Sequence, residues 1–477
     1  MRYLYLYIVT LFTVAASGLP LSAVTVTSQA GTLCDVITDT GISELTLDGT
    51  IDAIDFDFIA SHLTGLRSLD LSSAVITACS GVTLFNGRTS SPANTLPEYS
   101  LTGSPLTSII LPSSLTAIAD GALAGSAIKS LVIPAGVDSL GTAFCNGCAA
   151  LESVTFATTR LGAIPAGAFK DCTSLTAIEL PQGVATIGAD AMRGCTGLTR
   201  VTLPATLGYI GHDAFSYTTL TDIDLSGCRR LGAIGGWAFA GCDRLTSAIL
   251  PDGVTTLGDG IFFGCDALET VVMPASATTL APYMFKGTAI TDGSSVVGPH
   301  TSAIGRYALY GNDRLTVLTL PSALTSIGDM ALAGMSGLTR IDATALTALP
   351  TLGDDVFAGT SGSDVTLAVA ESMADVFKAA PQWKEFNVIY DMSSVADTRV
   401  DGSLDVGMRY DDNTLYINSS EPLALITVVD LTGRTVARHA ADRVTEAAVG
   451  INLARGTAVV VSIMLTDGRT ATFKTIL

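Results

Sequence analysis

Residues 175–197 read LTAIELPQGVATIGADAMRGCTG, and the segment that starts at Leu198, LTRVTLPATLGYIGHDAFSYTT, repeats the same pattern. Aligned on the opening leucine or isoleucine, eleven copies follow one another at spacings of 22 to 25 residues. A fixed period in the twenties with an L-x-x-L-x-L opening is typical of a leucine-rich solenoid. The copies open at Leu106, Ile128, Leu151, Leu175, Leu198, Leu220, Leu245, Leu268, Ile290, Leu315 and Leu338.

Each copy predicts a strand followed by a turn. Apolar residues at positions 1, 4 and 6 alternate with variable ones, which indicates a half-buried strand. Proline follows at position 7 in most copies and ends the strand, because it has no N–H to donate to a sheet. A small–large pair such as Ala214-Phe215 completes the copy. One coil cannot bury these residues alone, so we expect stacked coils with continuous internal columns.

The combined pattern LxxIxLPxxLxxIGxxAFxGC resembles the BspA-like branch of bacterial leucine-rich repeats. The resemblance covers about 260 residues. It implies a protein that is exported and lies at a bacterial surface, where several members of this branch act as adhesins.

The flanks of the array predict its caps. Residues 24–105 carry the same pattern less regularly, as expected of a terminal cap, with a short helix near 54–63 and a surface loop over 86–104. After the last copy, a helical turn before Pro381 and the apolar residues Trp383 and Phe386 predict a C-terminal lid, so the solenoid with this cap spans 106–390.

The N-terminus reads as a secretory signal over residues 1–23. Arg2 supplies the positive end, an apolar run follows, and Leu21-Ser22-Ala23 is a small-residue cleavage site. No later stretch approaches 18 apolar residues, so we expect no transmembrane segment once the signal is removed.

The repeat period disappears after the lid. Residues 391–404 contain few large apolar side chains and predict a linker. Residues 405–477 alternate as strands of a small all-β sandwich. This end resembles the C-terminal sorting domain of the type IX secretion system, through VVDLTGRTV, LARGTAVVVSIML and a closing FKTIL. The resemblance implies the secretion machinery as a partner, with Gly433, Arg434, Gly456 and Lys474 as matching residues. Thr457-Ala458 departs from the family, which usually has an aromatic residue after the glycine.

Composition and motifs argue against nucleic-acid binding and against catalysis. A net charge of −19 without a basic run makes nucleic acid a poor partner. The four histidines are scattered, and no HExxH or G-x-S-x-G motif occurs. We therefore expect no enzyme activity, catalytic residues or cofactor.

The sequence predicts no metal site. Cys145 and Cys148 form a lone CxxC without the further ligands that zinc needs. The carboxylates between Asp48 and Asp57 lack the glycine and terminal glutamate of a calcium loop, and we interpret them as a solvated capping face. Five cysteines occupy one repeat position, three residues before the next opening leucine, and we interpret them as small buried groups: Cys148, Cys172, Cys195, Cys242 and Cys265.

Candidate binding residues lie outside the core positions. Positions 2, 3 and 5 should project from the strand face, where Glu179, Arg200, Asp222 and Asp224 form a polar patch. Tyr209, His212, Tyr217 and Trp237 lie in neighbouring copies, and exposed aromatic residues of this kind anchor interfaces. The alternative for Trp237 is that it fills a two-residue insertion in its own coil.

Three functional hypotheses remain open. The first is a non-enzymatic, adhesin-like binding protein, at the cell surface (outer membrane-associated) or secreted, that recognises a host or bacterial surface protein or glycan through the solenoid face. The second is a glycan-binding accessory protein that uses the aromatic residues near Trp237. The third is a structural spacer without a specific ligand. The fold alone does not choose among them.

Overall fold

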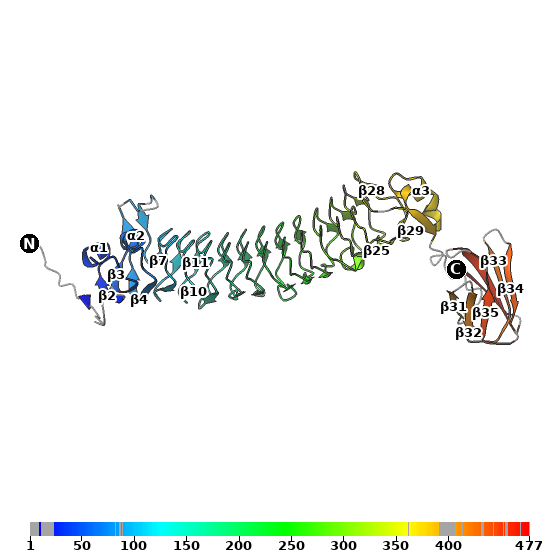
Figure 1. The fold of residues 1–477 in the computed structure, drawn as a ribbon, viewed down its shortest axis with the longest axis horizontal. Helices are drawn as coiled ribbons and strands as arrows, with labels where there is room; N and C mark the ends of the chain where they lie inside the picture. The colour runs from blue at the N-terminus through cyan, green and yellow to red at the C-terminus, as the bar shows by residue number, and fades with distance from the viewer. Residues whose placement is uncertain are drawn as a thin grey trace, which may run out of the picture. The chain divides into compact units, whose positions relative to one another are not determined.

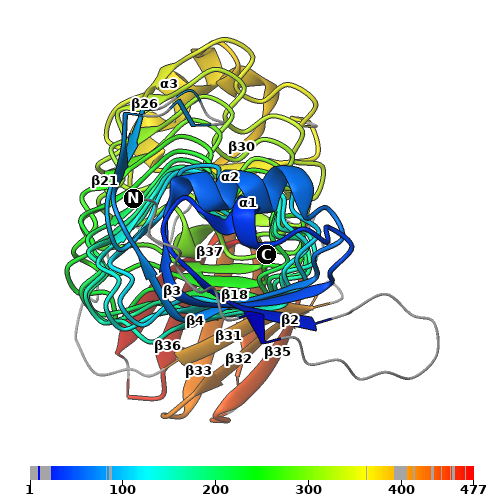
Figure 2. The same ribbon diagram turned by 90° about the vertical axis from the view of Figure 1, so that its left-hand side faces the viewer.

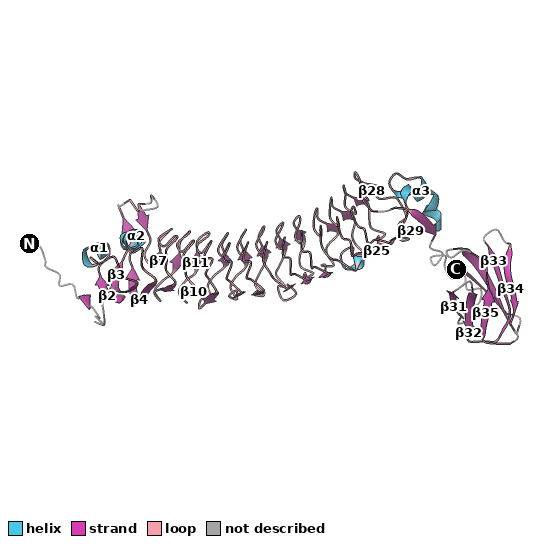
Figure 3. Cartoon of the chain, in the orientation of Figure 1, coloured by secondary structure: helices cyan, strands magenta, loops and turns pink. Residues whose placement is uncertain are grey.

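The chain folds into two compact units. Figures 1 and 3 show the coils of the first unit and the antiparallel strands of the second. The first comprises Met1–Ile341 and Pro350–Val365, and the second comprises Asp342–Leu349 and Thr366–Leu477. In the computed structural model the described residues are 9–10, 23–81, 83–84, 87, 89–360, 362–390, 406–411, 414–430, 434–441, 443–451, 453, 457–467 and 469–476. The predicted linker and nearly all of the predicted signal lie outside these residues.

The first unit is a β-solenoid in which most copies of the repeat contribute two short strands. The longer strand falls at the predicted opening, and the shorter one at the second apolar pair. The longer strands are β8 Ser108–Ile110, β10 Ser130–Ile133, β12 Ser153–Phe156, β14 Ala177–Glu179, β16 Arg200–Thr202, β18 Asp222–Asp224, β20 Ser247–Ile249, β22 Thr270–Val272, β25 Val317–Thr319 and β27 Arg340–Ala343. The shorter strands are β7 Thr95–Leu96, β9 Ala117–Ile118, β11 Ser139–Leu140, β13 Ala163–Ile164, β15 Thr186–Ile187, β17 Tyr209–Ile210, β19 Ala233–Ile234, β21 Thr256–Leu257, β23 Thr279–Leu280, β24 Ala303–Ile304, β26 Ser326–Ile327 and β28 Thr351–Leu352.

Neighbouring coils pair in parallel and in the register of the repeat. Ile178 lies opposite Val201, and Ile187 lies opposite Ile210. The copy that opens at Ile290 departs from this pattern, because the 3-10 helix η1 Gly293–Ser295 follows its opening residue. The solenoid expected from the period is therefore confirmed, with one irregular copy.

The internal columns are built as the alternation predicts. Phe215, Phe239, Phe262 and Phe285 are fully buried in consecutive coils. Their rings stack with centroids 5.4, 5.8 and 5.7 Å apart. Each coil thus covers the apolar ring of the one before it, which no isolated coil could do.

The cysteine column (Cys148, Cys172, Cys195, Cys242 and Cys265) is also buried, and all nine cysteines of the chain are free thiols. Burial was expected, but the side chains are more than small apolar groups. Cys195 donates to the carbonyl oxygen of Phe169 in the preceding coil at 3.0 Å, and Cys265 donates likewise to Phe239 at 3.1 Å. The thiols therefore donate hydrogen bonds to backbone carbonyl groups inside the preceding coil.

In the N-terminal cap, parallel strands and two helices lie at the end of the coil stack (Figure 2), and two further strand pairings of the cap are antiparallel. Its elements are β1 Val9–Thr10, β2 Ala23–Ser28, α1 Leu33–Val36, β3 Glu44–Ile51, α2 Ala53–His62, β4 Ser68–Ile76, β5 Cys79–Ser80 and β6 Ser90–Ser91. Helix α2 confirms the predicted short helix.

The acidic cluster of the cap is not the solvated face that we expected. Asp52 and Asp55 are buried, and together they form a capping box at the start of α2. Asp55 accepts backbone N–H groups of Gly31, Leu33 and Asp52 at 2.8 to 2.9 Å. These carboxylates tie α1 to α2 because the first N–H groups of a helix need acceptors. Burial nevertheless raises the pKa of Asp55 above its usual range.

The expected surface loop over 86–104 is largely a coil of the solenoid. Strand β7 lies in it and pairs with β9, and both Leu96 and Leu101 are buried. The two leucines continue the copy that opens at Leu66, after an insertion that carries β5 and β6. The prediction was wrong because the Ser- and Pro-rich surface positions hide the two widely spaced leucines.

The second unit contains the lid and the antiparallel strands. The lid comprises β29 Thr366–Val369, the 3-10 helix η2 Glu371–Met373, α3 Ala374–Ala379, the 3-10 helix η3 Trp383–Glu385 and β30 Asn387–Tyr390. Trp383 is buried, and its ring contacts Phe377 and Phe386 with centroids 5.1 and 6.2 Å away. This confirms the predicted apolar cluster around Trp383.

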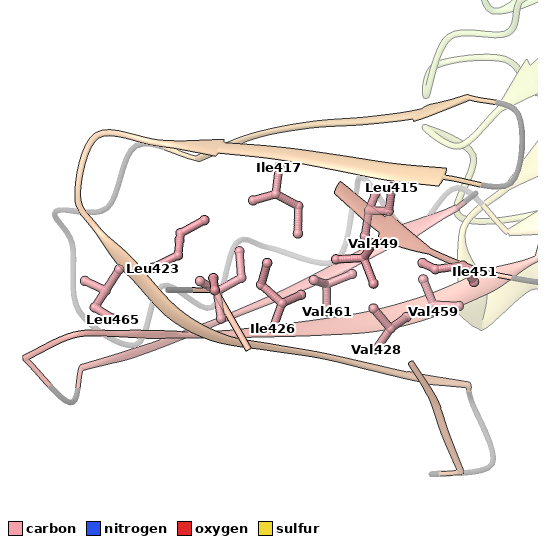
Figure 4. Close-up of a cluster of buried hydrophobic side chains, with 12 residues drawn as sticks. Leu415, Ile417, Leu423, Ile426, Val428, Val449, Ile451, Val459, Val461 and Leu465 are labelled. Atoms are coloured by element: carbon pink, nitrogen blue, oxygen red, sulfur yellow. The ribbon is translucent and has the colours of Figure 1, made fainter. Parts of the chain in front are cut away.

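The remaining strands form two antiparallel sheets, as predicted. They are β31 Val406–Asp411, β32 Thr414–Ser419, β33 Leu423–Asp430, β34 Thr435–Ala440, β35 Glu446–Gly450, β36 Ala458–Leu465 and β37 Thr470–Ile476, in the orders β31-β32-β35 and β34-β33-β36-β37. Their inward side chains, among them Ile417, Ile426 and Val461, make a core of their own (Figure 4). In the described part of the chain, no helix has the length and apolar character needed to cross a membrane.

Candidate functional site

The predicted polar patch lies on the exposed face of the longer strands. Pairing of β14 with β16 places Glu179 opposite Thr202 and Arg200 opposite Ala177. Asp222 and Asp224 lie on β18, which pairs with β20. All four charged side chains are exposed, as positions 3 and 5 predict.

Local hydrogen bonds hold the two aspartates of β18. Asp224 accepts the backbone N–H of Ser226 at 2.8 Å, and hydrogen bonding to Ser226 lowers the pKa of Asp224. Asp222 accepts the hydroxyl of Thr221 at 2.9 Å. Both aspartates therefore bond to residues next to them in the chain, and no described contact brings the four charged side chains together.

Tyr209 belongs to a different surface from the patch. It lies on β17 among the shorter strands, between Thr186 and Ala233, and is 42% exposed. His212 is exposed on the turn that follows, where its ring lies against Asp213. The candidate binding residues predicted from the sequence therefore lie on several faces of the solenoid, and the fold does not bring them together into one site.

Trp237 lies in a column of residues with left-handed backbone. Its φ is 59°, and the residues directly before the small–large pair of other coils share this conformation. This left-handed column comprises Tyr99, Gly121, Ala143, Gly167, Asp190, Asp213, Trp237, Gly260, Tyr283, Tyr307, Met330 and Asp355. Glycine suits such a position, whereas a bulky side chain there is strained.

Aromatic side chains in this column lean onto the next coil. The ring of Trp237 covers Gly260, where an added Cβ would lie 2.7 Å from the ring. Tyr99 covers Gly121 in the same way. Where the next residue of the column is large, the rings stack instead, as Tyr283 and Tyr307 do at 5.1 Å with an interplanar angle of 5°.

These contacts gather five rings, which we call the aromatic cluster: Trp237, Phe263, Tyr283, Tyr307 and Tyr310. Trp237 lies 5.1 Å from Phe263 and 5.9 Å from Tyr283, and Tyr307 lies 5.5 Å from Tyr310, between ring centroids. All five side chains are only partly buried. The cluster is thus a half-exposed aromatic surface that spans consecutive coils.

Two cations lie on the ring faces of the cluster. The Lys286 ammonium is 4.9 Å from the centroid of Tyr310 and 5.0 Å from that of Tyr307, and Phe263 and Tyr283 also lie within 6 Å. The Arg306 guanidinium is 5.1 Å from the centroid of Tyr283. Such cation–π contacts fix the position of a charge without neutralising it.

The sequence singled out Trp237 but missed the other four rings. Trp237, Tyr283 and Tyr307 each stand directly before the small–large pair, whereas Phe263, Lys286 and Tyr310 stand directly after it. Comparing these two positions across copies would have found the cluster. Trp237 does not fill the insertion of its copy, because Ile210 pairs with Ile234 at a spacing of 24 residues, which places the insertion before Ile234.

The residues assigned to the sorting domain fall at a hairpin and at a strand. Arg434 donates from Nε to Asp430 Oδ2 and from its backbone N–H to Oδ1, each at 3.0 Å. Lys474 lies on β37 opposite Val460. Gly433 and Gly456 lie outside the described residues. Within the described chain, no three histidine, cysteine or acidic side chains are grouped as they would be around a metal ion.

A solved structure with a similar fold supports the solenoid architecture. A leucine-rich repeat protein from Bacteroides ovatus is 18% identical, with a TM-score of 0.59, over 80% of this chain and 98% of that one. A leucine rich cell surface protein from Faecalibacterium prausnitzii is 19% identical, with a TM-score of 0.36, over 74% of this chain and 89% of that one. The pneumococcal vaccine antigen PcpA is 18% identical, with a TM-score of 0.36, over 73% of this chain and 79% of that one.

Comparison with protein families is more specific, although no curated protein matches the chain. The family described as "BspA type Leucine rich repeat region" matches residues 84–163, 162–291 and 297–398, which are well over half of the sequence. The match begins before Leu106, in agreement with the coil that contains Leu96 and Leu101. The repeat pattern, the stacked coils and the extent of this match show that the chain belongs to the BspA-type leucine-rich repeat family.

Proposed function

We propose that this protein is a non-enzymatic, adhesin-like binding protein that recognises a macromolecule of the host or of a neighbouring cell through its solenoid. The observation that carries the proposal is the aromatic cluster. Partly exposed aromatic residues anchor interfaces because they supply a large rigid contact area at low cost in conformational entropy.

The backbone under the cluster supports a role in binding. Trp237, Tyr283 and Tyr307 all have positive φ, where most bulky residues are disfavoured by roughly 1–3 kcal/mol each. Glycine occupies the same position in other coils, at Gly121 and Gly167, so the fold does not require a ring there. Strain of this kind tends to persist where a side chain serves function.

The proposed location is the cell surface or the outside of the cell. The N-terminal pattern over 1–23 supports export, and the likeness of residues 405–477 to a type IX sorting domain supports passage across the outer membrane. The Arg434–Asp430 pair braces the hairpin that carries the VVDLTGRTV motif. The secretion machinery is then a second partner, separate from the ligand of the solenoid.

Binding to arrayed host matrix proteins and glycans tests the proposal. The purified full chain is compared with a Trp237→Gly, Tyr283→Gly double variant, since glycine fits both left-handed positions. Tyr99→Gly is the matched control, because it removes a ring from the same column in a distant coil. We expect the double variant to bind at least about tenfold more weakly and the control to bind normally.

Two results would contradict the proposal. If the double variant binds as tightly as the unmodified protein, the aromatic cluster is not the binding surface. If the unmodified protein binds nothing on the arrays, the structural spacer becomes the better description.

A further inference from the structure

The cations of the aromatic cluster point to the charge of the ligand. Lys286 is half-buried among four rings, Arg306 is exposed over Tyr283, and neither takes part in an ion pair within the described residues. The chain as a whole carries a net charge of −19. These two cations therefore place local positive charge on one aromatic surface of a protein that is acidic overall.

From this we infer that the aromatic cluster binds a carboxylate-bearing polysaccharide. The apolar C–H faces of the sugar rings lie against the parts of the Trp237 and tyrosine rings that stacking leaves exposed, and a sugar carboxylate accepts hydrogen bonds from Lys286 and Arg306. Hydrogen bonds between ionised groups are stronger than neutral ones, so these two side chains would supply specificity for the acidic sugar. The inference rests on the proposed function and names the ligand class of the same surface.

The spacing of the coils favours a polysaccharide over a peptide. Parallel strands bring successive coils about 4.8 Å apart, and each unit of a linear polysaccharide is a rigid ring of comparable length, so successive sugars can contact successive coils. An extended peptide advances only about 3.3 Å per residue and falls out of step. The cluster also lies at turns, where no strand edge is offered for a peptide to pair with.

The charge of the protein favours a carboxylated chain over a densely sulfated one. Lys286 and Arg306 supply only two positive charges, whereas a heavily sulfated polymer is held by many. Beyond the site, the acidic surface repels such a polymer, and the repulsion acts over about 8 Å at physiological salt. A chain with one carboxylate every one or two sugars avoids most of this cost.

The test is a set of immobilised uronate polysaccharides (polygalacturonate, alginate and hyaluronan), each beside its carboxyl-reduced form, which keeps the backbone and loses the charge. Heparin and a neutral glucan complete the set. We expect the full chain to bind at least one uronate polymer about tenfold or more tightly than its reduced form. That binding should weaken as salt rises.

Single substitutions test whether the binding of uronate polymers depends on the aromatic cluster. Lys286→Gln keeps the stem and removes the charge, so it should lose about tenfold in affinity, whereas Lys286→Arg should retain most of it. Lys129→Gln removes an exposed charge many coils away and should bind normally. Circular dichroism of each variant confirms that it is folded.

The outcomes separate this inference from the proposed function. Equal binding of acidic and reduced polymers, tightest binding of heparin, or no effect of Lys286→Gln overturns the carboxylate site. If Trp237 and Tyr283 are needed for binding to an arrayed protein while no uronate binds, the proposed function stands and this inference falls. If no ligand depends on those rings, both fall.

Discussion

Asn312 shows how one polar side chain inside a coil serves the backbone of its neighbours. It is fully buried and donates to the carbonyl oxygens of Phe285 at 2.7 Å and Leu309 at 2.9 Å. It also accepts the hydroxyl of Thr288 at 2.6 Å. Cysteine does the same work in other coils, which explains why thiols, hydroxyls and an amide alternate in one internal column.

A core phenylalanine and a surface threonine test the register at the residue scale. Phe215 is fully buried between coils, so Phe215→Ala should lower the free energy of unfolding by about 3–5 kcal/mol. Thr202 is exposed on β16, so Thr202→Ala should change it by less than about 0.5 kcal/mol. Urea denaturation measures both, and equal losses at the two sites would contradict the assigned register.

At the scale of the element, two glycines of one coil should differ in how much stability the protein loses when each is replaced by alanine. Gly260 belongs to the left-handed column, and Gly264 lies four residues later. Gly260 and Gly264 have φ of 61° and 64°, so alanine strains both positions by about 1 kcal/mol. A Cβ at Gly260 would also meet the Trp237 ring at 2.7 Å, whereas nothing lies within 4 Å at Gly264. Gly260→Ala should therefore destabilise the protein by roughly 1–2 kcal/mol more than Gly264→Ala.

Denaturant midpoints and tryptophan fluorescence measure this difference. The displaced Trp237 should change its emission in Gly260→Ala alone, while Trp383, buried in the lid, serves as an unchanged reference. Equal destabilisation with unchanged emission would mean that the ring does not rest on Gly260.

The cysteine column predicts slow thiol chemistry in the folded protein. Burial raises the pKa of the Cys195 thiol to about 12, so the reactive thiolate is scarce at neutral pH. Alkylation of the native protein should modify the exposed Cys34 and leave Cys172, Cys195, Cys242 and Cys265 intact until denaturant is added. Mass spectrometry reads out each site, and disulfide links among these four in the native protein would refute the prediction.

On the scale of the whole molecule, the antiparallel strands of the tail have their own core, and its described buried residues lie between Leu415 and Leu465. We therefore expect that deleting residues 405–477 leaves a soluble solenoid with a nearly unchanged melting temperature. In a bacterium with a type IX secretion system, the shortened protein should accumulate in the periplasm and be absent from the surface. Cell fractionation and thermal melting measure the two effects.

One outcome would contradict the sorting assignment, and another would contradict the domain boundary. If the shortened protein still reaches the surface, the sorting assignment is wrong. If it no longer melts cooperatively, the predicted boundary between solenoid and tail is wrong.

The sequence by itself determined the coils. Alternation at positions 1, 4 and 6, a proline that ends the strand and the small–large pair are local signals, and local signals repeated eleven times predict strands, turns and buried columns reliably. The same reasoning located α2 and the strands of the tail. It failed over 86–104, where an insertion separates Leu96 from the opening of its copy.

Only the tertiary structure decided which surface side chains act together. Trp237 and Tyr283 are far apart in the sequence, yet stacking of coils brings their rings to 5.9 Å. The left-handed backbone then aims each ring at the following coil, which the identity of a single residue does not reveal. Contacts between copies depend on both register and backbone conformation. For that reason the aromatic cluster could be recognised in the structure but not in the repeat pattern of the sequence.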